Sequence, residues 1–506
     1  MRAPLPVVAA ALLGVTTVLG FAPFGLSALP VFTLAGLFLL WRRARSPRAA
    51  AAAGFAYGLG LFGAGVSWVY IALAQFGGME GALAALATTG FCLYLALFPA
   101  FVGWVTARLA PAGTGARLVA AVACWSLSEW LRSWLLSGFP WLSVGYAQTH
   151  AALGAYAPVG GVFLVGLAVA TSAAAVAYAP QALRNRRRGA AAAAVLLAVW
   201  GTAWGLRSIE WSHATGDPLT VSLVQGNIAE DIKFEAAYRD ASLAAYAALV
   251  AQAKGRLIVL PESALPMFAD EVPVDYFAQL QEAAKERGGD LLVGLFFFEP
   301  RAAGEDEDRY FNSVISVGMA PTQVYRKRHL VPFGETIPAK PIVGWFIRRV
   351  LQIPLADQTP GPADQAPIDV AGQRVAVNIC YEDAFGAELI RQLPAATLLI
   401  NVTNDAWYGR SLAAEQHEEI AAMRALETAR PMLRATNTGI TSLIDHHGME
   451  LQRLPWFTRG ILEGSIAGRT GTTPYVRCGD ALAVAGALLL AAASFAIGRR
   501  RANDSG

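Results

Sequence analysis

The sequence predicts a polytopic α-helical membrane protein that carries one α/β domain outside the membrane. Of its 506 residues 55% are hydrophobic and only 15% are charged, whereas soluble proteins carry about 25% charged residues. Long apolar runs gather in residues 1–206 and 481–498, while residues 207–480 have an ordinary globular composition. We therefore expect a transmembrane bundle at 1–206, an extramembrane domain at 207–480, and a last helix with a basic tail at 481–506.

Eight apolar runs are long enough to cross a membrane as helices of about 20 residues. The first run follows Arg2 as in a secretory signal, but it lacks a clear small-residue cleavage site and another run follows at once, so we expect it to be retained. The eight predicted spans are residues 5–21, 26–41, 50–73, 81–105, 118–136, 159–178, 189–206 and 481–497.

Among the loops of this bundle, arginine occurs only in alternate ones. The loops at 22–25, 74–80 and 137–158 contain neither lysine nor arginine. The other connections carry Arg42, Arg43, Arg45 and Arg48, then Arg108 and Arg117, then Arg184, Arg186, Arg187 and Arg188, and finally Arg499, Arg500 and Arg501. The positive-inside rule then predicts that both termini are cytoplasmic and that residues 207–480 lie outside, in the periplasm of a two-membrane bacterium.

Several functional classes are disfavoured by composition. A formal net charge of +3 and the absence of a basic stripe argue against binding of nucleic acid. The four cysteines show neither metal-ligand spacing nor a disulfide pattern, so we expect no metal and no cofactor. Glu129 and Arg132, three residues apart on one face of a predicted span, favour a structural ion pair between helices over a functional role.

Strand and helix patterns alternate within the extramembrane domain, which is typical of a layered α/β fold. Active sites of such sheets lie at the carboxyl ends of strands. Strands are predicted at 219–225, 257–260, 291–298, 312–318, 323–328, 375–380, 398–403 and 440–445, and helices at 240–253, 276–287, 384–393 and 414–428.

Three of these predicted strands end in or near a reactive group. Glu262 follows the strand at 257–260, Lys327 is the last residue but one of the strand at 323–328, and Cys380 ends the strand at 375–380. A carboxylate can accept the proton of a thiol nucleophile, and an ammonium group can stabilise the oxyanion that forms on an attacked carbonyl. Together the three residues predict an acyl-transfer site.

Other catalytic systems fit less well. The sequence has no Gly-x-Ser-x-Gly elbow of an α/β-hydrolase. The sequence around His417 lacks the second histidine of a zinc-protease helix. A Cys–His pair with His329, His446 or His447 stays open, because nothing in the sequence ties one of them to Cys380.

The motifs around these residues resemble those of the nitrilase superfamily, and in more detail its membrane-bound branch, the apolipoprotein N-acyltransferases. The resemblance covers nearly the whole chain, with its motifs in the same order. They are Gly20-Phe-Ala-Pro-Phe24, Gly138-Phe-Pro-Trp141, Val224-Gln-Gly-Asn227, Leu260-Pro-Glu262-Ser, Tyr325-Arg-Lys327 through Glu335, Asn378-Ile-Cys380-Tyr-Glu382, Asn401 through Trp407, Arg424-Ala-Leu-Glu427 and Thr473-Pro-Tyr475.

The resemblance implies an αββα sandwich and a two-step reaction in the bacterial inner membrane. Cys380 would take a fatty acyl group from a phospholipid, typically phosphatidylethanolamine, as a thioester. The acyl group would then pass to the N-terminal amine of the diacylglyceryl-cysteine of an apolipoprotein. Glu262 would be the general base and Lys327 the stabiliser of the tetrahedral intermediates.

The resemblance also implies supporting roles. The backbone N–H of Tyr381 would be a second oxyanion donor, and Glu335 and Glu382 would support the triad. A simpler interpretation of these two carboxylates is a salt bridge that orients Lys327.

Two positions depart from the family pattern. Leu260 replaces a tryptophan before Pro-Glu, which affects packing, and Phe234 replaces a tryptophan, which keeps an aromatic surface but loses the indole N–H. Phe234 and Trp407 are candidate substrate-binding residues. So are Trp345 and Phe346 in the apolar segment 341–354, which we expect to be a mobile lid over the acyl path rather than part of the domain core.

Two alternatives remain at this point. A membrane-tethered nitrilase or amidase that hydrolyses small C–N bonds would share the triad, but eight spans exceed what a tether needs. A polytopic transporter with an outer binding domain predicts internal repeats and paired charges within several spans, and the sequence shows neither.

Overall fold

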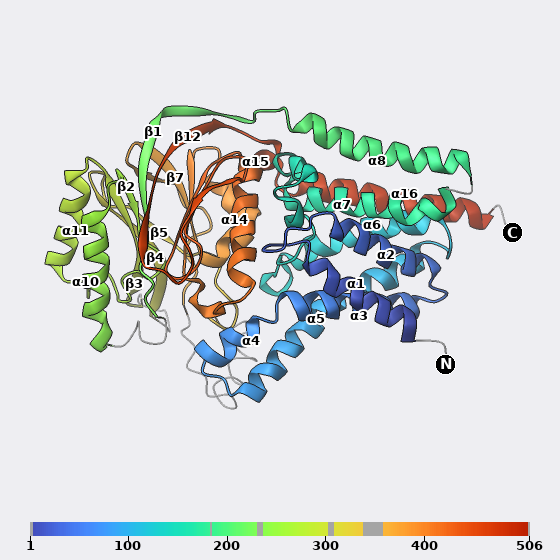
Figure 1. Cartoon of the computed structure of the whole chain (residues 1–506), viewed down its shortest axis with the longest axis horizontal. Coiled ribbons are helices and arrows are strands. Elements are labelled where there is room, and N and C mark those ends of the chain that lie inside the picture. Colours follow the sequence, from blue (N-terminus) through green and yellow to red (C-terminus); the bar gives the residue numbers. More distant parts are fainter. Residues whose placement is uncertain (1–3, 183–184, 230–235, 302–307, 337–357, 504–506) are drawn as a thin grey trace. The chain divides into compact units, whose positions relative to one another are not determined.

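The computed structural model describes residues 4–182, 185–229, 236–301, 308–336 and 358–503, and it divides into two compact units (Figure 1). The first unit consists of residues up to 70, residues 81–210 and residues from 473 onward. The second consists of residues 71–80 and 211–472. The second unit thus includes a short segment, 71–80, that is distant in sequence from the other residues of this unit.

The first unit is helical, and a helix overlaps each of the eight runs predicted from the sequence. Its helices are α1 Pro4–Val18, α2 Leu29–Arg43, α3 Pro47–Gly65, α4 Val69–Ile71, α5 Gly81–Leu109, α6 Gly115–Arg132, α7 Ala157–Ala182, α8 Arg186–Leu206, α15 Pro474–Cys478 and α16 Ala481–Asn503.

Only some of the described helices are long and apolar enough to cross a membrane on that criterion alone. Three qualify, at Gly81–Leu109, Ala152–Ala179 and Arg186–Leu206, and a fourth would be α3 together with Val69–Phe76, a pair bent by 57°. The helix α1 has 15 residues, which span about 22 Å against a hydrocarbon layer of about 30 Å. The prediction of eight spans is therefore supported only in part.

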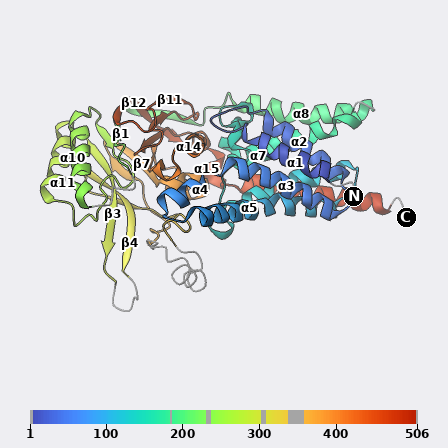
Figure 2. The ribbon, with the colours of Figure 1, turned by 60° about the horizontal axis from the view of Figure 1, so that its bottom comes forward.

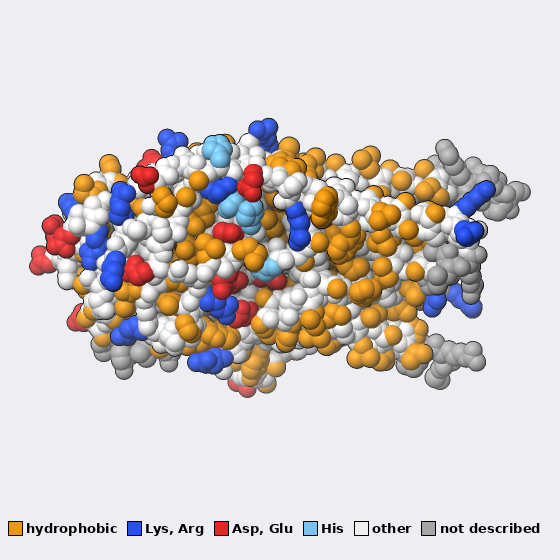
Figure 3. All heavy atoms as spheres, turned by 45° about the horizontal axis from the view of Figure 1, so that its top comes forward, with side chains coloured by type: hydrophobic (Ala, Val, Ile, Leu, Met, Phe, Trp, Pro, Cys, Tyr) orange, Lys and Arg blue, Asp and Glu red, His pale blue; other side chains and the backbone are white. Residues whose placement is uncertain are grey.

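Glycines let the helices of this unit approach each other closely. A Cβ atom on Gly54 of α3 would lie 2.1 Å from the carbonyl oxygen of Pro99 in α5, and one on Gly14 of α1 would lie 2.0 Å from the carbonyl oxygen of Tyr57 in α3. Small residues at helix contacts are typical of membrane bundles. Figure 3 shows hydrophobic side chains covering much of the visible surface of this unit, and exposed ones include Leu86, Phe101 and Leu197.

Glu129 and Arg132, which we expected to form an ion pair between helices, both hold the loop that follows α6. Glu129 Oε1 accepts a hydrogen bond from the Val144 amide at 2.8 Å. Arg132 donates to the carbonyl oxygen of Trp141 at 2.7 Å, to Ser143 Oγ at 3.1 Å and to the carbonyl oxygen of Phe139. The charges thus satisfy backbone groups of an irregular segment, as buried loops require.

The second unit contains two six-stranded sheets. The first has the order β12-β1-β2-β3-β4-β5 and the second the order β11-β10-β9-β8-β7-β6. In the first sheet these strands are β1 Ser212–Gln225, β2 Leu257–Val259, β3 Asp290–Glu299, β4 Arg309–Gly318, β5 Val324–Arg326 and β12 Gly460–Gly471. In the second they are β6 Ile368–Val370, β7 Gln373–Ile379, β8 Leu398–Thr403, β9 Met432–Thr436, β10 Ser442–Ile444 and β11 Glu450–Arg453.

Each sheet has a parallel centre and antiparallel edges. The strands β1, β2 and β3 are parallel, as are β7, β8 and β9, while β4, β5 and β12 and β6, β10 and β11 pair antiparallel with their neighbours. Figure 2 shows β3 and β4 running together as a long hairpin.

Helices cover both sheets, so the unit has the αββα layers that the resemblance implies. Figure 1 shows α10 Ala236–Gln252 and α11 Val274–Glu286 on the outer side of the first sheet, and α14 Ala413–Thr428 on the outer side of the second. A buried cluster that includes Tyr246, Leu249 and Leu280 fills the space between α10, α11 and the first sheet.

The predicted strands and helices differ from the structure in two ways. The expected helix at 384–393 is replaced by the short turns Cys380–Ala384 and Ile390–Gln392 around a four-residue helix at Gly386–Leu389. The strands β6, β9, β11 and β12 were not predicted. The strand β9 contains the fully buried Arg434. Because this residue is charged, the segment does not show the apolar pattern that predicts a buried strand.

Candidate active site

The two sheets bring the predicted strand ends together. Glu262 follows β2 and Lys327 follows β5 in the first sheet, while Cys380 follows β7 in the second. Asn404, at the end of β8, joins the sheets because its amide donates a hydrogen bond to Glu262 Oε2 at 3.1 Å. Glu262, Lys327 and Cys380 are 6%, 1% and 5% exposed, so this is a buried site.

Lys327 lies between two carboxylates. Its Nζ atom is 3.2 Å from Glu262 Oε1 and 2.7 Å from Glu335 Oε1. Asn312 Nδ2 donates to the same Glu262 oxygen at 2.8 Å. Burial alone would lower the pKa of Lys327, but the charges of Glu262 and Glu335 outweigh it and raise the pKa well above its usual range. The ammonium group therefore stays charged at neutral pH.

Cys380 occupies the turn from β7 into the segment Cys380–Ala384 with a φ of +53°. Left-handed backbone in a residue other than glycine costs free energy and is often found at active sites. Burial, and next the carboxylate of Glu262, raise the pKa of the Cys380 thiol well above its usual range, although Lys327 acts in the opposite direction. The resting cysteine is therefore a neutral thiol, and a base has to remove its proton before it can act as a nucleophile.

Glu382 connects the Lys327 strand to the Cys380 strand through backbone groups. One carboxylate oxygen accepts from the amides of Arg328 at 2.6 Å and His329 at 3.1 Å, and the other accepts from the amide of Ile379 at 2.7 Å. Tyr325 Oη donates to both oxygens at 3.1 Å. Glu335 contacts Lys327 directly, whereas Glu382 fixes the two chain segments on which Lys327 and Cys380 stand.

Burial gives Glu382 a pH-dependent effect on stability. Desolvation raises its pKa to about 7, although the three backbone hydrogen bonds favour the charged form. The pKa of Glu382 is higher in the folded state than in the unfolded state. Its contribution to the free energy of unfolding is therefore fully present below pH 4.5 and is lost as the pH rises through about 7. Relative to Glu382→Gln, the free energy of unfolding of the native protein should fall by up to about 3 kcal/mol over this range.

Thermal unfolding of both proteins in detergent between pH 4.5 and 8 measures this difference. The matched control is Glu463→Gln, which changes a carboxylate on the edge strand β12 of the first sheet that accepts a hydrogen bond from Ser222. If stability changes with pH to the same extent in Glu382→Gln and in the native protein, the prediction is contradicted.

The structure describes two of the five remaining predicted site residues. Tyr381 is buried directly after Cys380, and its ring packs against Phe385 with centroids 5.0 Å apart. Trp407 lies in the turn Asp405–Tyr408 after β8, is 39% exposed, and stacks edge to face on Phe76 at 5.9 Å. Three further predicted residues lie outside the described residues. They are Phe234, Trp345 and Phe346.

A group of buried polar residues at the site was not predicted from the sequence. Asn312 binds Glu262, and four charged side chains, Asp383, Asp405, His417 and Arg434, contact one another behind Cys380. Burial and Arg434 would lower the pKa of His417, but the two carboxylates raise it to about 9. The only signal in the sequence was the unusual density of charged residues in otherwise apolar segments.

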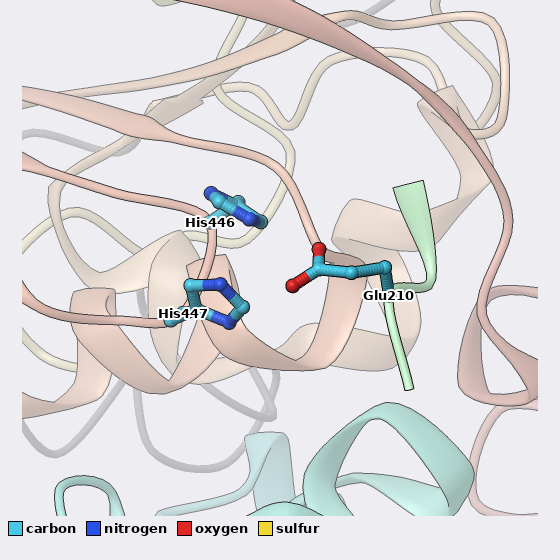
Figure 4. Close-up of side chains that lie close together, drawn as sticks. All are labelled: Glu210, His446 and His447. Carbon is cyan, nitrogen blue, oxygen red and sulfur yellow. The ribbon is translucent and has the colours of Figure 1, made fainter. Parts of the chain in front are cut away.

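The three histidines considered as partners of Cys380 have other contacts. His329 stacks on Phe385 at 3.5 Å and pairs with Glu388 at 3.0 Å. His446 and His447 follow β10, and their rings lie 3.9 Å apart (Figure 4). Glu210, also labelled there, belongs to the first unit.

Comparisons with known proteins agree with this combination of a helical unit and an α/β unit. Residues 220–475 match the family model for carbon-nitrogen hydrolases, which places the second unit in that class of protein. Residues 13–175 match the model for the apolipoprotein N-acyltransferase N-terminal domain. The chain belongs to the apolipoprotein N-acyltransferase family.

Curated relatives match over nearly their full length. The chain is 50% identical to the apolipoprotein N-acyltransferase of Nitrosomonas europaea, with 98% of each chain covered. It is 42% identical to that of Methylococcus capsulatus, with 97% of this chain and 96% of the relative covered. It is 40% identical to that of Chromobacterium violaceum, with 99% and 95% covered.

Proposed function

We propose that this protein transfers a fatty acyl group from a phospholipid, through a thioester on Cys380, to the N-terminal amine of the diacylglyceryl-cysteine of bacterial apolipoproteins. The observation that carries the proposal is the buried arrangement of Glu262, Lys327 and Cys380 in a chain whose relatives bear the name of this activity. Phosphatidylethanolamine is the proposed donor. The reaction uses no metal and no cofactor.

In the first half-reaction Glu262 removes the proton of the Cys380 thiol while the sulfur attacks the ester carbonyl of the lipid. The positive charge of Lys327 and the backbone N–H of Tyr381 stabilise the resulting oxyanion. When the intermediate collapses, the C–O bond breaks, and Glu262 returns the proton to the departing lysophospholipid. The raised pKa of Cys380 supports a mechanism with a base, because little thiolate exists beforehand.

In the second half-reaction the α-amino group of the apolipoprotein attacks the thioester carbonyl. Glu262 takes a proton from the amine, and Lys327 again faces the oxyanion. The C–S bond breaks, the sulfur recovers a proton, and an amide remains on the lipoprotein. Because both half-reactions use the same site in turn, we propose ping-pong kinetics.

We also propose how the chain is placed in the inner membrane. All eight helices would cross it, with residues 1–206 as the bundle, residues 207–480 as the periplasmic catalytic domain, and residues 481–506 as the last span and a cytoplasmic tail. The alternation of arginine-rich and arginine-free loops supports this arrangement. Helices too short to span about 30 Å can be accommodated by local thinning of the bilayer.

Mass spectrometry of the purified full-length chain in nanodiscs tests the first half-reaction. With phosphatidylethanolamine as the only acyl source, we expect the Cys380 peptide to gain one acyl group and one lysophospholipid to be released per thioester. Hydroxylamine should remove the label. A lipopeptide with a diacylglyceryl-cysteine should discharge the thioester and become N-acylated.

Two comparisons separate this function from the alternatives. A dialkyl ether phospholipid cannot donate an acyl group, so it should give no label. A membrane-tethered amidase would instead be acylated by small amides and would ignore the lipid. Labelling of Cys380 by a small amide without labelling by the phospholipid would therefore overturn the proposal.

Trp407 is proposed to contact the substrate, because its indole ring is half exposed close to the end of β8. Replacing it with alanine should raise the KM for one substrate by roughly five-fold, which corresponds to the loss of about 1 kcal/mol of aromatic contact, and leave kcat nearly unchanged. Trp407→Phe should restore most of the affinity. Steady-state kinetics with each substrate varied in turn measures the effect, and a fall in kcat alone would contradict it.

A further inference from the structure

Four charged side chains form a closed ring behind Cys380. His417 Nδ1 lies 2.8 Å from Asp405 Oδ1, and His417 Nε2 lies 2.9 Å from Asp383 Oδ1. Arg434 closes the ring, with Nη1 at 3.1 Å from Asp383 Oδ2 and Nη2 at 3.0 Å from Asp405 Oδ2. None of the four residues is more than 2% exposed. Such a buried set is costly unless its charges are matched.

The contacts determine the protonation state of the histidine. Both ring nitrogens of His417 face carboxylate oxygens, which only accept hydrogen bonds when they are ionised. Both nitrogens therefore carry a hydrogen, and His417 is an imidazolium. Two positive and two negative charges then balance in the ring. An imidazolium with both hydrogens engaged cannot serve as the base for Cys380.

The ring reaches the backbone of the nucleophile. His417 Nε2 lies 3.3 Å from the carbonyl oxygen of Cys380, and Asn401 Nδ2 donates to the same oxygen at 3.1 Å. Arg434 Nη1, which can only donate, lies 2.7 Å from Asn401 Oδ1. This contact orients the Asn401 amide so that its NH₂ group faces Cys380.

A held carbonyl fixes the neighbouring amide as well. The peptide group between Cys380 and Tyr381 is planar and trans, so its C=O and N–H bonds point in opposite directions. Because His417 and Asn401 draw the carbonyl oxygen toward the ring, the N–H of Tyr381 is directed away from it. The φ of +53° at Cys380 costs free energy, and the two hydrogen bonds to its carbonyl compensate for it.

We propose that His417 and Asn401 are positioning residues that lock the Cys380–Tyr381 peptide group so that the Tyr381 N–H faces the oxyanion of the acyl group. Asp383, Asp405 and Arg434 act through them by holding both side chains in place. The inference rests on the proposed function only in that Cys380 is acylated through a tetrahedral intermediate.

Two reagents distinguish positioning from general stability in the full-length protein. Iodoacetamide alkylates the Cys380 sulfur by displacing iodide, with no oxyanion. A p-nitrophenyl ester of a short fatty acid acylates the same sulfur through an oxyanion, forming the C–S bond and releasing nitrophenol. Site-resolved mass spectrometry gives both rates at Cys380 separately from those at the other cysteines.

We expect His417→Gln and Asn401→Asp to slow acylation between 10-fold and 100-fold relative to alkylation, on the order of what losing an oxyanion donor costs. Asn401→Asp exchanges the donor that faces Cys380 for an acceptor with almost no change of volume, so it decides the matter if His417→Gln does not fold. The control is Arg430→Met, which removes a buried guanidinium that donates to the carbonyl oxygens of Ala396 and Gly471. It should leave the ratio of the two rates unchanged.

An unchanged ratio in both site variants would overturn the inference, whether both rates fall together or neither falls. The ester does not depend on the lipid donor. If the native Cys380 reacts with the ester but not with a phospholipid, the proposed function fails, and the ratio still decides the role of His417 and Asn401.

Discussion

Cys380→Ala should abolish acyl transfer, with a loss of at least about 10⁴-fold, because no other group can carry the acyl chain. Alanine removes one buried sulfur atom and leaves the turn after β7 able to form, so the protein should still fold. Cys380→Ser keeps a nucleophilic atom, but a hydroxyl group is far less acidic than a thiol, so its activity should be similarly low. Release of lysophospholipid by the purified protein and lipoprotein N-acylation in cells depleted of the native enzyme measure the loss.

The other cysteines provide matched controls for this variant. Cys92 is buried within α5 and Cys478 is exposed at the end of α15, so alanine at either position should leave transfer intact. Lipoprotein N-acylation that continues in cells whose only enzyme is Cys380→Ala or Cys380→Ser would show that the assignment of the nucleophile is wrong.

Glu262→Gln should slow both half-reactions by about 10²-fold to 10⁴-fold, the range expected for the loss of a general base. The glutamine can still accept the hydrogen bond from the Asn404 amide, and Lys327 keeps its contact with Glu335 at 2.7 Å. The defect should therefore be in proton transfer rather than in folding. Single-turnover measurements of thioester formation and of its discharge by a lipopeptide read the two steps separately.

Glu463→Gln is the matched control for Glu262→Gln. This carboxylate is also on the first sheet and binds Ser222 Oγ at 2.6 Å, but it has no part in the proposed site, so both half-reactions should proceed at the native rate. If Glu262→Gln slows substrate binding while the single-turnover rates stay normal, Glu262 is not the base.

The proposed catalytic residues could be located because each of them ends or follows a strand of its own. A short apolar run that is followed closely by Glu262, or that ends in Cys380, can be recognised from the sequence alone. Lys327 was identified in the same way, although β5 has only three residues. The contact between Lys327 and Glu335 was among the interpretations considered, since a lysine in a buried site needs a carboxylate partner.

The role of Glu382 could not be predicted from its place beside Cys380. A salt bridge to Lys327 was the simpler expectation, but the carboxylate accepts hydrogen bonds from three backbone amides, two in the segment after β5 and one in β7. Which backbone groups are left without partners depends on how β5 and β7 end, and this is set by the packing of the two sheets. The histidine–aspartate–arginine ring behind Cys380 was missed for the same reason.

The sequence by itself determined the class of the protein and which residues are candidates for its reactive groups. Apolar runs, arginine placement and polar strand ends are local properties. They depend only on residues that are neighbours in the sequence, so they can be recognised without the structure. Only the tertiary structure decided how the strand ends meet, why Cys380 is buried as a neutral thiol beside Glu262, and that His417, Asp383 and Arg434 face one another. These depend on contacts between residues far apart in the chain, whose desolvation and charge pairing exist only once both sheets have formed.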